Sequence, residues 1–501
     1  MENMVLKRIN EIKQRLREND KIRLLYHKTI LRIKNRNILH NIKDDLEEID
    51  KSILDMQKLG KNSHKRLLVA GCVGLCPKTA FLAKLNAELP EDCDVVLLLE
   101  NNSKYYNLEN LRFPDVSDEE YRALKQFIVP KLFRKNDYVP YSRVSIISGI
   151  KELLENKPFL NEAARNLYER HFDMRKEYAE YFSFCSYNYL SRVIDTIHPD
   201  CVMLWNQFFA FHHIFEGVCK EYGITCTYFE YGVLPGTYAI ESMGQMGESY
   251  PAQEYEEFIN LSVSEKEMEK ADEIWTYIKD NRINRKDQPK RDITKILKKK
   301  LKKNRPTLFV AGQNDFESGL SPYTEQTKKY HSPIFENSDS VVEYLAQLSK
   351  KNKWNLVYKM HPFVTKYSLP KHFPGNVIIL NDVDINDLIV ATDLTITILS
   401  QTGYVALFNE RPVLMLGYTQ LRGKGCSYEA FRKEQIEEQI QLALKNGFTM
   451  EQKEKFKRHI AQICKYYVYE DKWFEKNISY GKSMRECADL VMNFMEKKDT
   501  M

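Results

Sequence analysis

The stretch from Trp354 to Gly417 constrains the fold of this chain more than any other. Short apolar runs alternate there with helical segments: one run ends at residues 358–362, a second spans 394–398 and a third spans 412–416. Strands that alternate with helices indicate βαβ units and a parallel, doubly wound sheet. Ligands bind to such sheets at the carboxyl ends of the strands. The chemistry is therefore expected where these runs end.

The first run ends in Lys359, Met360, His361 and Pro362. Alternation along a strand puts Lys359 and His361 on the same side. Proline fixes the preceding backbone as extended and ends the strand. An imidazole and an ammonium at a strand tip can both donate to a phosphate oxygen. The alternative is a histidine that only satisfies a local contact at the strand end.

The second run leads into a turn with Ser400, Thr402 and Gly403, followed by a short helix. Either hydroxyl can cap that helix, and glycine allows a ligand to approach the backbone closely. Free N–H groups at a helix start also bind phosphate. Capping and phosphate binding are compatible, so the two strand ends together predict a nucleotide-phosphate site.

Apolar strand-like runs occur in two blocks, and 501 residues are too many for one ordinary domain. We therefore expect two Rossmann-like doubly wound domains. The expected division is a helical basic N-terminal arm (1–62), a first Rossmann-like domain (63–290), a second Rossmann-like domain (305–450) and C-terminal helices (451–501).

Charge separates the first 43 residues from the rest of the chain. They hold twelve Lys/Arg against four Asp/Glu, whereas the whole chain is nearly balanced, with 75 basic and 70 acidic residues. The overall balance argues against a nucleic-acid-binding protein. The basic segment fits either a solvated helical hairpin or an amphipathic surface that contacts anionic lipid or a membrane-bound partner. No run approaches the roughly 20 apolar residues of a membrane span, so we expect a cytoplasmic protein, peripheral at most.

A glycine-containing turn, Gly71 to Gly74, precedes Lys78 and Thr79. The order is superficially that of a phosphate-binding P-loop, but Pro77 stands where that motif needs glycine. The turn is interpreted as a tight strand-to-helix connection, or as one that lines an acceptor cleft. His212 and His213 are neighbours on a predicted helix and point about 100° apart, so both are interpreted as structural. Neither the histidines nor the scattered cysteines suggest a metal site.

Two carboxylates stand on one strand-to-loop segment. Glu230 ends a predicted strand before a loop with glycine and proline, and Glu241 follows eleven residues later. A carboxylate at a strand tip can act as a general base for an acceptor hydroxyl. It can equally hold the loop by accepting backbone hydrogen bonds.

The order of these short motifs resembles a known family. The motifs are Glu230-Tyr231-Gly232, Leu234-Pro235-Gly236, Glu241-x-x-Gly244 with Ser249, Gly312-Gln313 with Asp315, Lys359-Met360-His361-Pro362, Ser400-x-Thr402-Gly403 and Arg411-Pro412-Val413. Their order is similar to that of the capsule polysaccharide biosynthesis family of bacterial glycosyltransferases, which includes Kdo transferases. The resemblance extends over about residues 201–428.

The resemblance implies a GT-B architecture, in which two Rossmann-like domains face a cleft and the donor nucleotide binds mainly to the second. It implies a CMP-activated sugar such as CMP-Kdo, a glycan or glycolipid acceptor, and no metal. His361, Ser400 and Thr402 would hold the donor phosphate, Gln313 would lie near the donor, and Glu230 would face the cleft. The position of Glu241 is usually aspartate in the family.

Two other functions compete with a nucleotide-sugar glycosyltransferase. Polyol-phosphate transferases of the teichoic-acid type, which use CDP-glycerol, also pair a His-Pro strand tip with a later segment like Asp387 to Asp393. Their usual Asp-Tyr-Ser-Ser turn is absent, because this chain has Ile398-Leu399-Ser400-Gln401. The third possibility is a non-catalytic scaffold of polysaccharide assembly, which would bind no nucleotide.

Overall fold

A computed structural model covers the whole chain. The residues that it describes are 22, 25–31, 33, 38–60, 63–74, 76–100, 116–134, 142–145, 149–171, 174–283, 293–361, 372–381 and 383–496 without 471–477. Pro362, one of the expected donor-site residues, and most of the basic N-terminal segment lie outside them.

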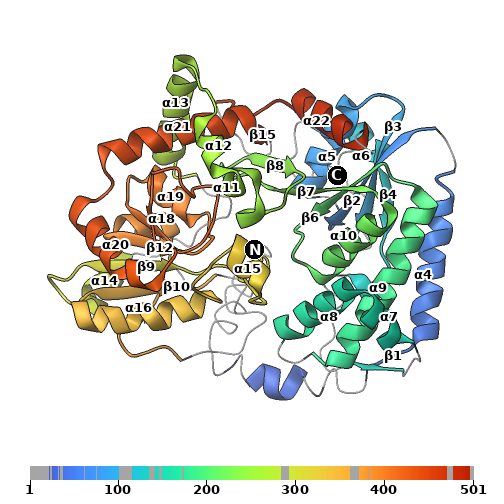
Figure 1. Cartoon of the computed structure of the whole chain (residues 1–501), viewed down its shortest axis with the longest axis horizontal. Coiled ribbons are helices and arrows are strands. Elements are labelled where there is room, and N and C mark those ends of the chain that lie inside the picture. The colour runs from blue at the N-terminus through green and yellow to red at the C-terminus, as the bar shows by residue number, and fades with distance from the viewer. Residues whose placement is uncertain are drawn as a thin grey trace, which may run out of the picture.

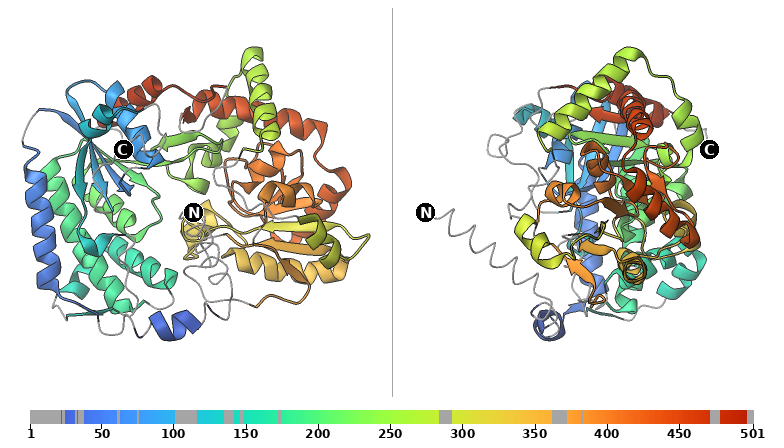
Figure 2. Two further views of the ribbon diagram at one scale, coloured as in Figure 1. Left: turned by 180° about the vertical axis from the view of Figure 1, so that it is seen from behind. Right: turned by 90° about the vertical axis from the view of Figure 1, so that its left-hand side faces the viewer.

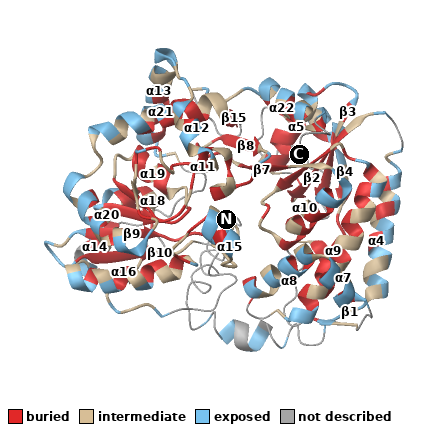
Figure 3. Cartoon of the chain, in the orientation of Figure 1, coloured by how far each residue is buried: buried red, intermediate tan, exposed pale blue. Residues whose placement is uncertain are grey.

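The chain forms two α/β lobes, each built on one mainly parallel sheet (Figure 1). The first sheet has the order β15-β8-β7-β6-β2-β3-β4. Strand β8 runs antiparallel to both of its neighbours, β7 and β15. Its strands are β2 (Lys65–Cys72), β3 (Cys93–Leu99), β4 (Lys125–Ile128), β6 (Cys201–Trp205), β7 (Thr225–Tyr231), β8 (Thr237–Glu241) and β15 (Val468–Glu470). Continuous apolar runs form the central strands because helices cover both faces (Figure 3).

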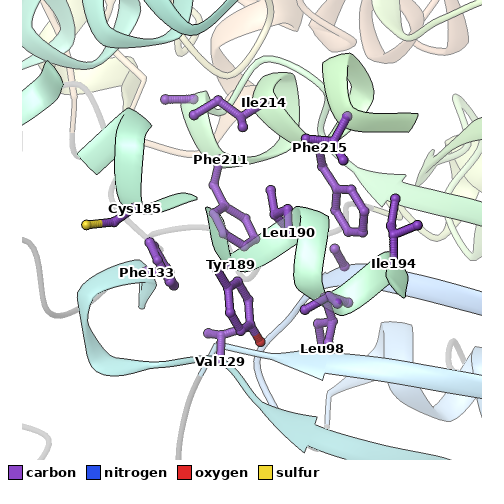
Figure 4. Close-up of a cluster of buried hydrophobic side chains, with 14 of the residues drawn as sticks. Leu98, Val129, Phe133, Cys185, Tyr189, Leu190, Ile194, Phe211, Ile214 and Phe215 are labelled. Atoms are coloured by element: carbon purple, nitrogen blue, oxygen red, sulfur yellow. The ribbon is translucent and has the colours of Figure 1, made fainter. Parts of the chain in front are cut away.

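Helices α4 (Ile42–Gln57), α9 (Lys176–Ile197) and α10 (Ala210–Tyr222) cover one face of the first sheet. Figure 4 shows side chains of α9 and α10, among them Tyr189, Leu190 and Phe215, packed above Leu98 of β3 and Val129. Helices α5 (Pro77–Glu88) and α22 (Met484–Glu496) cover the other face.

The second sheet is parallel throughout and has the order β11-β10-β9-β12-β13-β14. Its strands are β9 (Thr307–Ala311), β10 (Asn355–Lys359), β11 (Val377–Ile379), β12 (Leu394–Thr397), β13 (Val413–Met415) and β14 (Tyr428–Glu429). Helices α16 (Ser338–Asn352) and α20 (Lys433–Asn446) cover one face. Helices α13 (Glu265–Asp280), α18 (Ile385–Val390), α19 (Thr402–Phe408) and α21 (Met450–Tyr466) cover the other. The expected fold class of two Rossmann-like doubly wound domains is thereby confirmed.

The remaining elements are short or peripheral. They are β1 (Leu39–His40), β5 (Arg143–Val144), α6 (Asp118–Ala123), α7 (Ile150–Asn156), α8 (Pro158–Arg170), α11 (Tyr250–Gln253), α12 (Tyr255–Asn260), α14 (Ile293–Lys300), α15 (Glu325–Tyr330), the π-helical η1 (Tyr26–Leu31) and the 3₁₀ turns η3 (Lys131–Phe133) and η5 (Met246–Glu248). None of the helices in the described part of the chain combines the length and the apolar character that a bilayer crossing requires.

Each sheet has one point at which the strand order reverses. In the first sheet β2 lies between β3 and β6, and in the second β9 lies between β10 and β12. Successive units leave these central strands in opposite directions, which opens a crevice at their carboxyl ends. The strand order therefore designates the ends of β2 and β6, and of β9 and β12, as the ligand-binding positions.

Helices α4 and α22, near the two limits of the described residues, both pack in the first lobe. Helix α4 packs against α9, with Ile49, Ile53 and Met56 in the shared core, so residues 42–57 do not form part of a separate arm. At the other end, α21 packs on α13, after which β15 pairs with β8 and α22 packs on α5. This red C-terminal segment runs from the second lobe to the first in Figure 1 and in the reversed view of Figure 2. Helix α4 and the segment from α21 to α22 thus pack on the two lobes, whereas the expected division set residues 1–62 and 451–501 apart from the two domains.

Candidate functional site

Three expected site segments of the second lobe end at one edge of its sheet. Strands β10 and β12 flank β9 in parallel register, so Gln313, His361 and Ser400 all follow carboxyl strand ends. The turn after β9 is bound directly to β10, because the Gly312 N–H donates to the Lys359 carbonyl over 2.9 Å. The carboxyl ends of the adjacent strands β10, β9 and β12 therefore carry the predicted donor-site segments.

Gln313 is buried beneath the turn that follows β12. Its Oε1 accepts the Leu399 N–H at 2.7 Å and its Nε2 donates to Ser318 Oγ at 2.9 Å. Its own N–H donates to Ser338 Oγ at 3.2 Å. A side-chain amide with both ends engaged positions its neighbours, so Gln313 supports the turn above it.

Lys359 and His361 both lie at the carboxyl end of β10. The Lys359 ammonium donates to the Asn381 carbonyl at 2.6 Å, and the Met360 N–H donates to Asn381 Oδ1 at 3.0 Å. These bonds attach the end of β10 to the segment after β11. The Lys359 ammonium therefore places a positive charge at this strand end. His361 lies two residues beyond the strand and is half-buried.

Ser400 and Thr402 form a small closed arrangement at the start of α19. Ser400 Oγ accepts the Thr402 N–H at 3.2 Å and donates to Thr402 Oγ1 at 3.0 Å. The Thr402 hydroxyl thereby accepts one bond and keeps its own proton for a further partner. Gly403 has a packing role, because a Cβ there would lie 3.3 Å from Met415 Sδ and 3.4 Å from Leu421 Cδ1.

Two further residues lie at this edge: Asp315, which already belonged to the motif Gly312-Gln313 with Asp315, and Asn314, which the sequence analysis did not single out. Asp315 accepts the Ser338 N–H at 3.2 and 3.1 Å and the Ser338 hydroxyl at 2.7 Å, which holds the start of α16. Asn314 Nδ2 is buried and has no hydrogen-bond partner within the described part of the chain. An unsatisfied buried donor is costly and is rare away from ligand sites. Asn314 and Asp315 can be found in the sequence by their position, because both follow shortly after the apolar run of β9.

In the first lobe, Glu230 and Glu241 share one face of the sheet. Antiparallel pairing sets Glu230 opposite Ala239 and Tyr228 opposite Glu241, so the two carboxylates are diagonal neighbours. Glu230 is buried, and its Oε1 lies 3.5 Å from the Met246 N–H. Glu241 Oε2 accepts the Tyr250 N–H at 2.7 Å. The structure therefore brings together two residues that the sequence had only placed on one segment.

Tyr467 completes this group from the end of α21. Its hydroxyl donates to Glu241 Oε1 at 2.5 Å, across 226 positions of sequence. Burial raises the pKa of Glu241, and the hydrogen bonds from Tyr467 and Tyr250 lower it. Together with a smaller rise from the nearby Glu230 carboxylate, these effects put the pKa at about 8. The pKa of Tyr467 is also raised, by burial and by the same two carboxylates. Glu241 is thus mostly protonated at neutral pH, and no local motif pointed to Tyr467.

The two lobes meet at an interdomain seam, formed by residues 206–208 and 245–252 of the first lobe and 317–331 and 417–424 of the second. At its centre the Glu248 carboxylate lies 3.0 Å from Nε2 of the buried His331. Its other oxygen accepts from Gln207 Nε2 at 2.9 Å. Gln207 and Gln245 each accept the other's backbone N–H, at 2.8 and 2.7 Å.

Close backbone contacts surround this centre. A Cβ on Gly247 would lie 2.0 Å from the Tyr330 carbonyl oxygen and 2.8 Å from that of Tyr418, so only glycine fits between these segments. Asn206 Nδ2 donates to the Glu317 carbonyl at 2.8 Å, immediately after β6. The carboxyl edges of the two sheets therefore face each other across the seam.

Within the described residues, His, Cys, Asp and Glu side chains form no group of three that could hold a metal ion.

Several solved structures are similar to this chain at low identity. A domain titled Thermosulfurimonas dismutans KpsC, beta Kdo 2,7 transferase, is 15% identical, with a TM-score of 0.36 over 62% of this chain and 90% of that one. The KpsC beta Kdo 2,4 transferase of the same organism is 17% identical, with a TM-score of 0.37 over 52% and 79%. A Methanocaldococcus jannaschii UDP-GlcNAc 2-epimerase is 13% identical, with a TM-score of 0.32 over 78% and 98%. No curated protein matches the chain.

A family model matches the second half of the chain. Its description is capsule polysaccharide biosynthesis protein, and the match spans residues 252–466. These residues hold the complete second sheet and the expected donor-site segments, and they end one residue before Tyr467. The match confirms the resemblance predicted from the motifs after β9, β10 and β12. Over residues 252–466, this chain carries the sequence pattern of the capsule polysaccharide biosynthesis family.

Proposed function

We propose that the protein is a glycosyltransferase of bacterial capsule or surface polysaccharide biosynthesis. It transfers a sugar from a nucleotide donor, with CMP-Kdo the first candidate, to a glycan or glycolipid acceptor. The observation that carries the proposal is that the Gln313, His361 and Ser400 segments all lie at the carboxyl edge of the second sheet, inside the family match.

In this proposal the second lobe stabilises the departing nucleotide. The sugar–phosphate bond breaks, and negative charge grows on the phosphate oxygens. His361 and the Thr402 hydroxyl donate to those oxygens, and Lys359 adds positive charge from the same strand end. Such electrostatic stabilisation needs donors held in place before the reaction. Gln313 and Gly403 act indirectly, by shaping the turns that hold these donors.

The first lobe supplies the proton chemistry. An acceptor hydroxyl forms the new glycosidic bond, and its proton passes to Glu230. Glu241 keeps its own proton at neutral pH, so it serves as a hydrogen-bond donor beside Glu230 rather than as a second base. Charge stabilisation by His361, Lys359 and Thr402 makes a metal unnecessary in this scheme.

We also propose that the protein contacts anionic lipid through its N-terminal segment. Ile22, Tyr26, Ile30 and Ile33 recur at helical spacing and are exposed, as is Leu25. The surrounding sequence carries a basic excess, and this combination suits a negatively charged membrane surface.

Nucleotide binding separates the three candidate functions. CMP should raise the melting temperature, and at a hundredfold excess over its Kd it should add about 2.7 kcal/mol to the free energy of unfolding. His361→Ala should remove that shift, whereas His372→Ala, at an exposed histidine, should keep it. Differential scanning fluorimetry with CMP, CDP and UDP provides the measurement. A shift with CDP alone would favour polyol-phosphate transfer, and no shift at all would favour a scaffold.

Glu230→Gln tests the proposed base. The amide keeps the shape of the side chain but cannot take a proton, so transfer should fall by about 10²-fold or more. The CMP-induced melting shift should be unchanged, because Glu230 belongs to the other lobe. Turnover is measured by product analysis with a panel of nucleotide sugars. A variant that still turns over at the wild-type rate would exclude Glu230 as the base.

Glu241→Gln tests the buried proton. The folded protein keeps this proton up to about pH 8, whereas the unfolded chain releases it near the ordinary value of 4.5. Between these values the folded state binds more protons, so the free energy of unfolding of the wild type falls as pH rises. The variant should lack this contribution, which approaches about 1.4 kcal/mol per pH unit. Urea unfolding at pH 5 to 8 measures both slopes, and equal slopes would contradict the assignment.

Vesicle co-sedimentation tests the lipid contact. The full-length protein should sediment with vesicles that contain phosphatidylglycerol and remain in solution with pure phosphatidylcholine. Ile30→Asp with Ile33→Asp should weaken binding by about tenfold or more, since two apolar side chains no longer enter the interface. Leu54→Asp, at an exposed leucine of α4, is the matched control and should bind as the wild type does. Equal binding to both vesicles would refute an electrostatic contact.

A further inference from the structure

The turn between β2 and α5 has a chemistry that the proposed donor site and base do not use. Pro77 is the first residue of α5, where its missing N–H is not needed, and Lys78 follows it. The buried Thr79 hydroxyl accepts the Cys76 N–H at 2.9 Å and lies 3.0 Å from the Gly74 carbonyl, to which it can donate. The proline that breaks the P-loop pattern therefore starts the helix, and the turn is held rigidly around Lys78.

The Lys78 side chain is 8% exposed, although it carries an ammonium group. It donates to the Gly71 carbonyl and lies 4.1 Å from the centroid of the Trp205 ring. No carboxylate of the described residues forms an ion pair with it. An ammonium has three donors, so two remain for another partner. A buried cation that lacks a paired anion is unfavourable, which makes the position suited to an anionic ligand.

The position of this ammonium in the sheet also points to a ligand. The turn follows β2 at the strand-order reversal of the first sheet, between β3 and β6. Ligands bind at this point of open α/β sheets. The 12-residue helix α5 directs the positive end of its dipole at the same turn. Trp205, which ends β6, is partly exposed.

Close approach of three elements needs glycine at position 71. Gly71 has a φ of +90°, and a Cβ there would lie 2.7 Å from Trp205 Cβ and 2.8 Å from His212 Cε1. His212 Nδ1 lies 2.9 Å from the Asn206 carbonyl oxygen, and its Nε2 lies 3.9 Å from Glu100 Oε1. The Glu100 carboxylate thus lies beside His212, whereas the Lys78 ammonium donates to the turn itself.

We propose that the turn from Gly71 to Lys78 binds an anionic group, a phosphate or a carboxylate, through the Lys78 ammonium and the start of α5. The group belongs to the acceptor, since the turn lies in the same lobe as Glu230 and next to the seam through Asn206. The assignment to the acceptor rests on the proposed glycosyltransferase function, but the anion site itself does not.

Inorganic phosphate, pyrophosphate and acetate are the probes for this site, and Trp205 is a reporter within 4.1 Å of the ammonium. Titration of the full-length protein should change its tryptophan fluorescence. Trp205→Phe should remove the change, although three other tryptophans remain. A response to the two phosphates alone identifies a phosphoryl site, and a response to acetate as well identifies a general anion site.

Two substitutions should change phosphate binding in opposite directions, and a third is the control. Lys78→Met should weaken phosphate binding by at least about tenfold, because a charged hydrogen bond is lost. Lys84→Met, on the same helix, should leave it unchanged. Glu100→Gln should tighten it, because the carboxylate that lies beside His212 loses its charge. Should Lys78→Met fail to fold, Lys78→Arg, which keeps the charge, and Glu100→Gln decide the outcome.

Donor binding separates this site from the proposed function. Lys78→Met should keep the CMP-induced melting shift, and His361→Ala should keep the phosphate-induced fluorescence change. Loss of CMP binding with a retained phosphate response would refute only the donor assignment. The anion site is refuted if the wild type gives no fluorescence response, if Lys78→Met binds phosphate as the wild type does, or if Glu100→Gln does not tighten binding.

Discussion

The Glu248 carboxylate, held between His331 and Gln207, is the contact on which the arrangement of the two lobes depends. One of its oxygens lies 3.0 Å from the histidine of the second lobe, and the other accepts from a glutamine of the first. Both side chains are buried, so loss of the carboxylate would leave two buried polar groups unpaired. Gly247 makes the contact possible, because it lets the 245–252 segment pass between the Tyr330 and Tyr418 carbonyls. A polar contact at the centre of the seam specifies one relative orientation more strictly than an apolar one, because hydrogen bonds require defined directions.

That orientation turns two separate strand-order reversals into one functional region. The first lies at the ends of β2 and β6, beside Lys78, and the second at the ends of β9 and β12, above Gln313. Asn206 connects them, since its carbonyl contacts His212 near the first crevice and its side chain binds the Glu317 carbonyl. The C-terminal segment adds a second connection, because Tyr467 reaches Glu241 and β15 then joins the first sheet. Neither lobe would therefore complete its part of the region alone.

Much of the fold could be predicted from short-range patterns. The strands β10, β12 and β13 were expected from apolar runs, because buried parallel strands are uniformly apolar. Residues at strand ends, such as His361 and Ser400, could be assigned to one sheet edge for the same reason. Their individual roles could not be predicted. Gln313 and Gly403 were expected beside the ligand, yet one supports Leu399 and the other makes room for Met415. Motif matching identifies a residue type at a position, but a hydrogen-bond partner is a property of three-dimensional neighbours.

The sequence by itself determined two doubly wound sheets and the resemblance to the capsule polysaccharide biosynthesis family, which was expected over about residues 201–428 and which a family model matches over residues 252–466. These features depend on local periodicity and on the order of motifs along the chain. Only the tertiary structure decided that Tyr467 joins Glu230 and Glu241, that burial raises the pKa of Glu241 to about 8, and that Lys78 lies buried against Trp205. Desolvation and charge coupling depend on what surrounds a group in space. A contact between residues 226 positions apart produces no repeating pattern in the sequence from which it could be predicted.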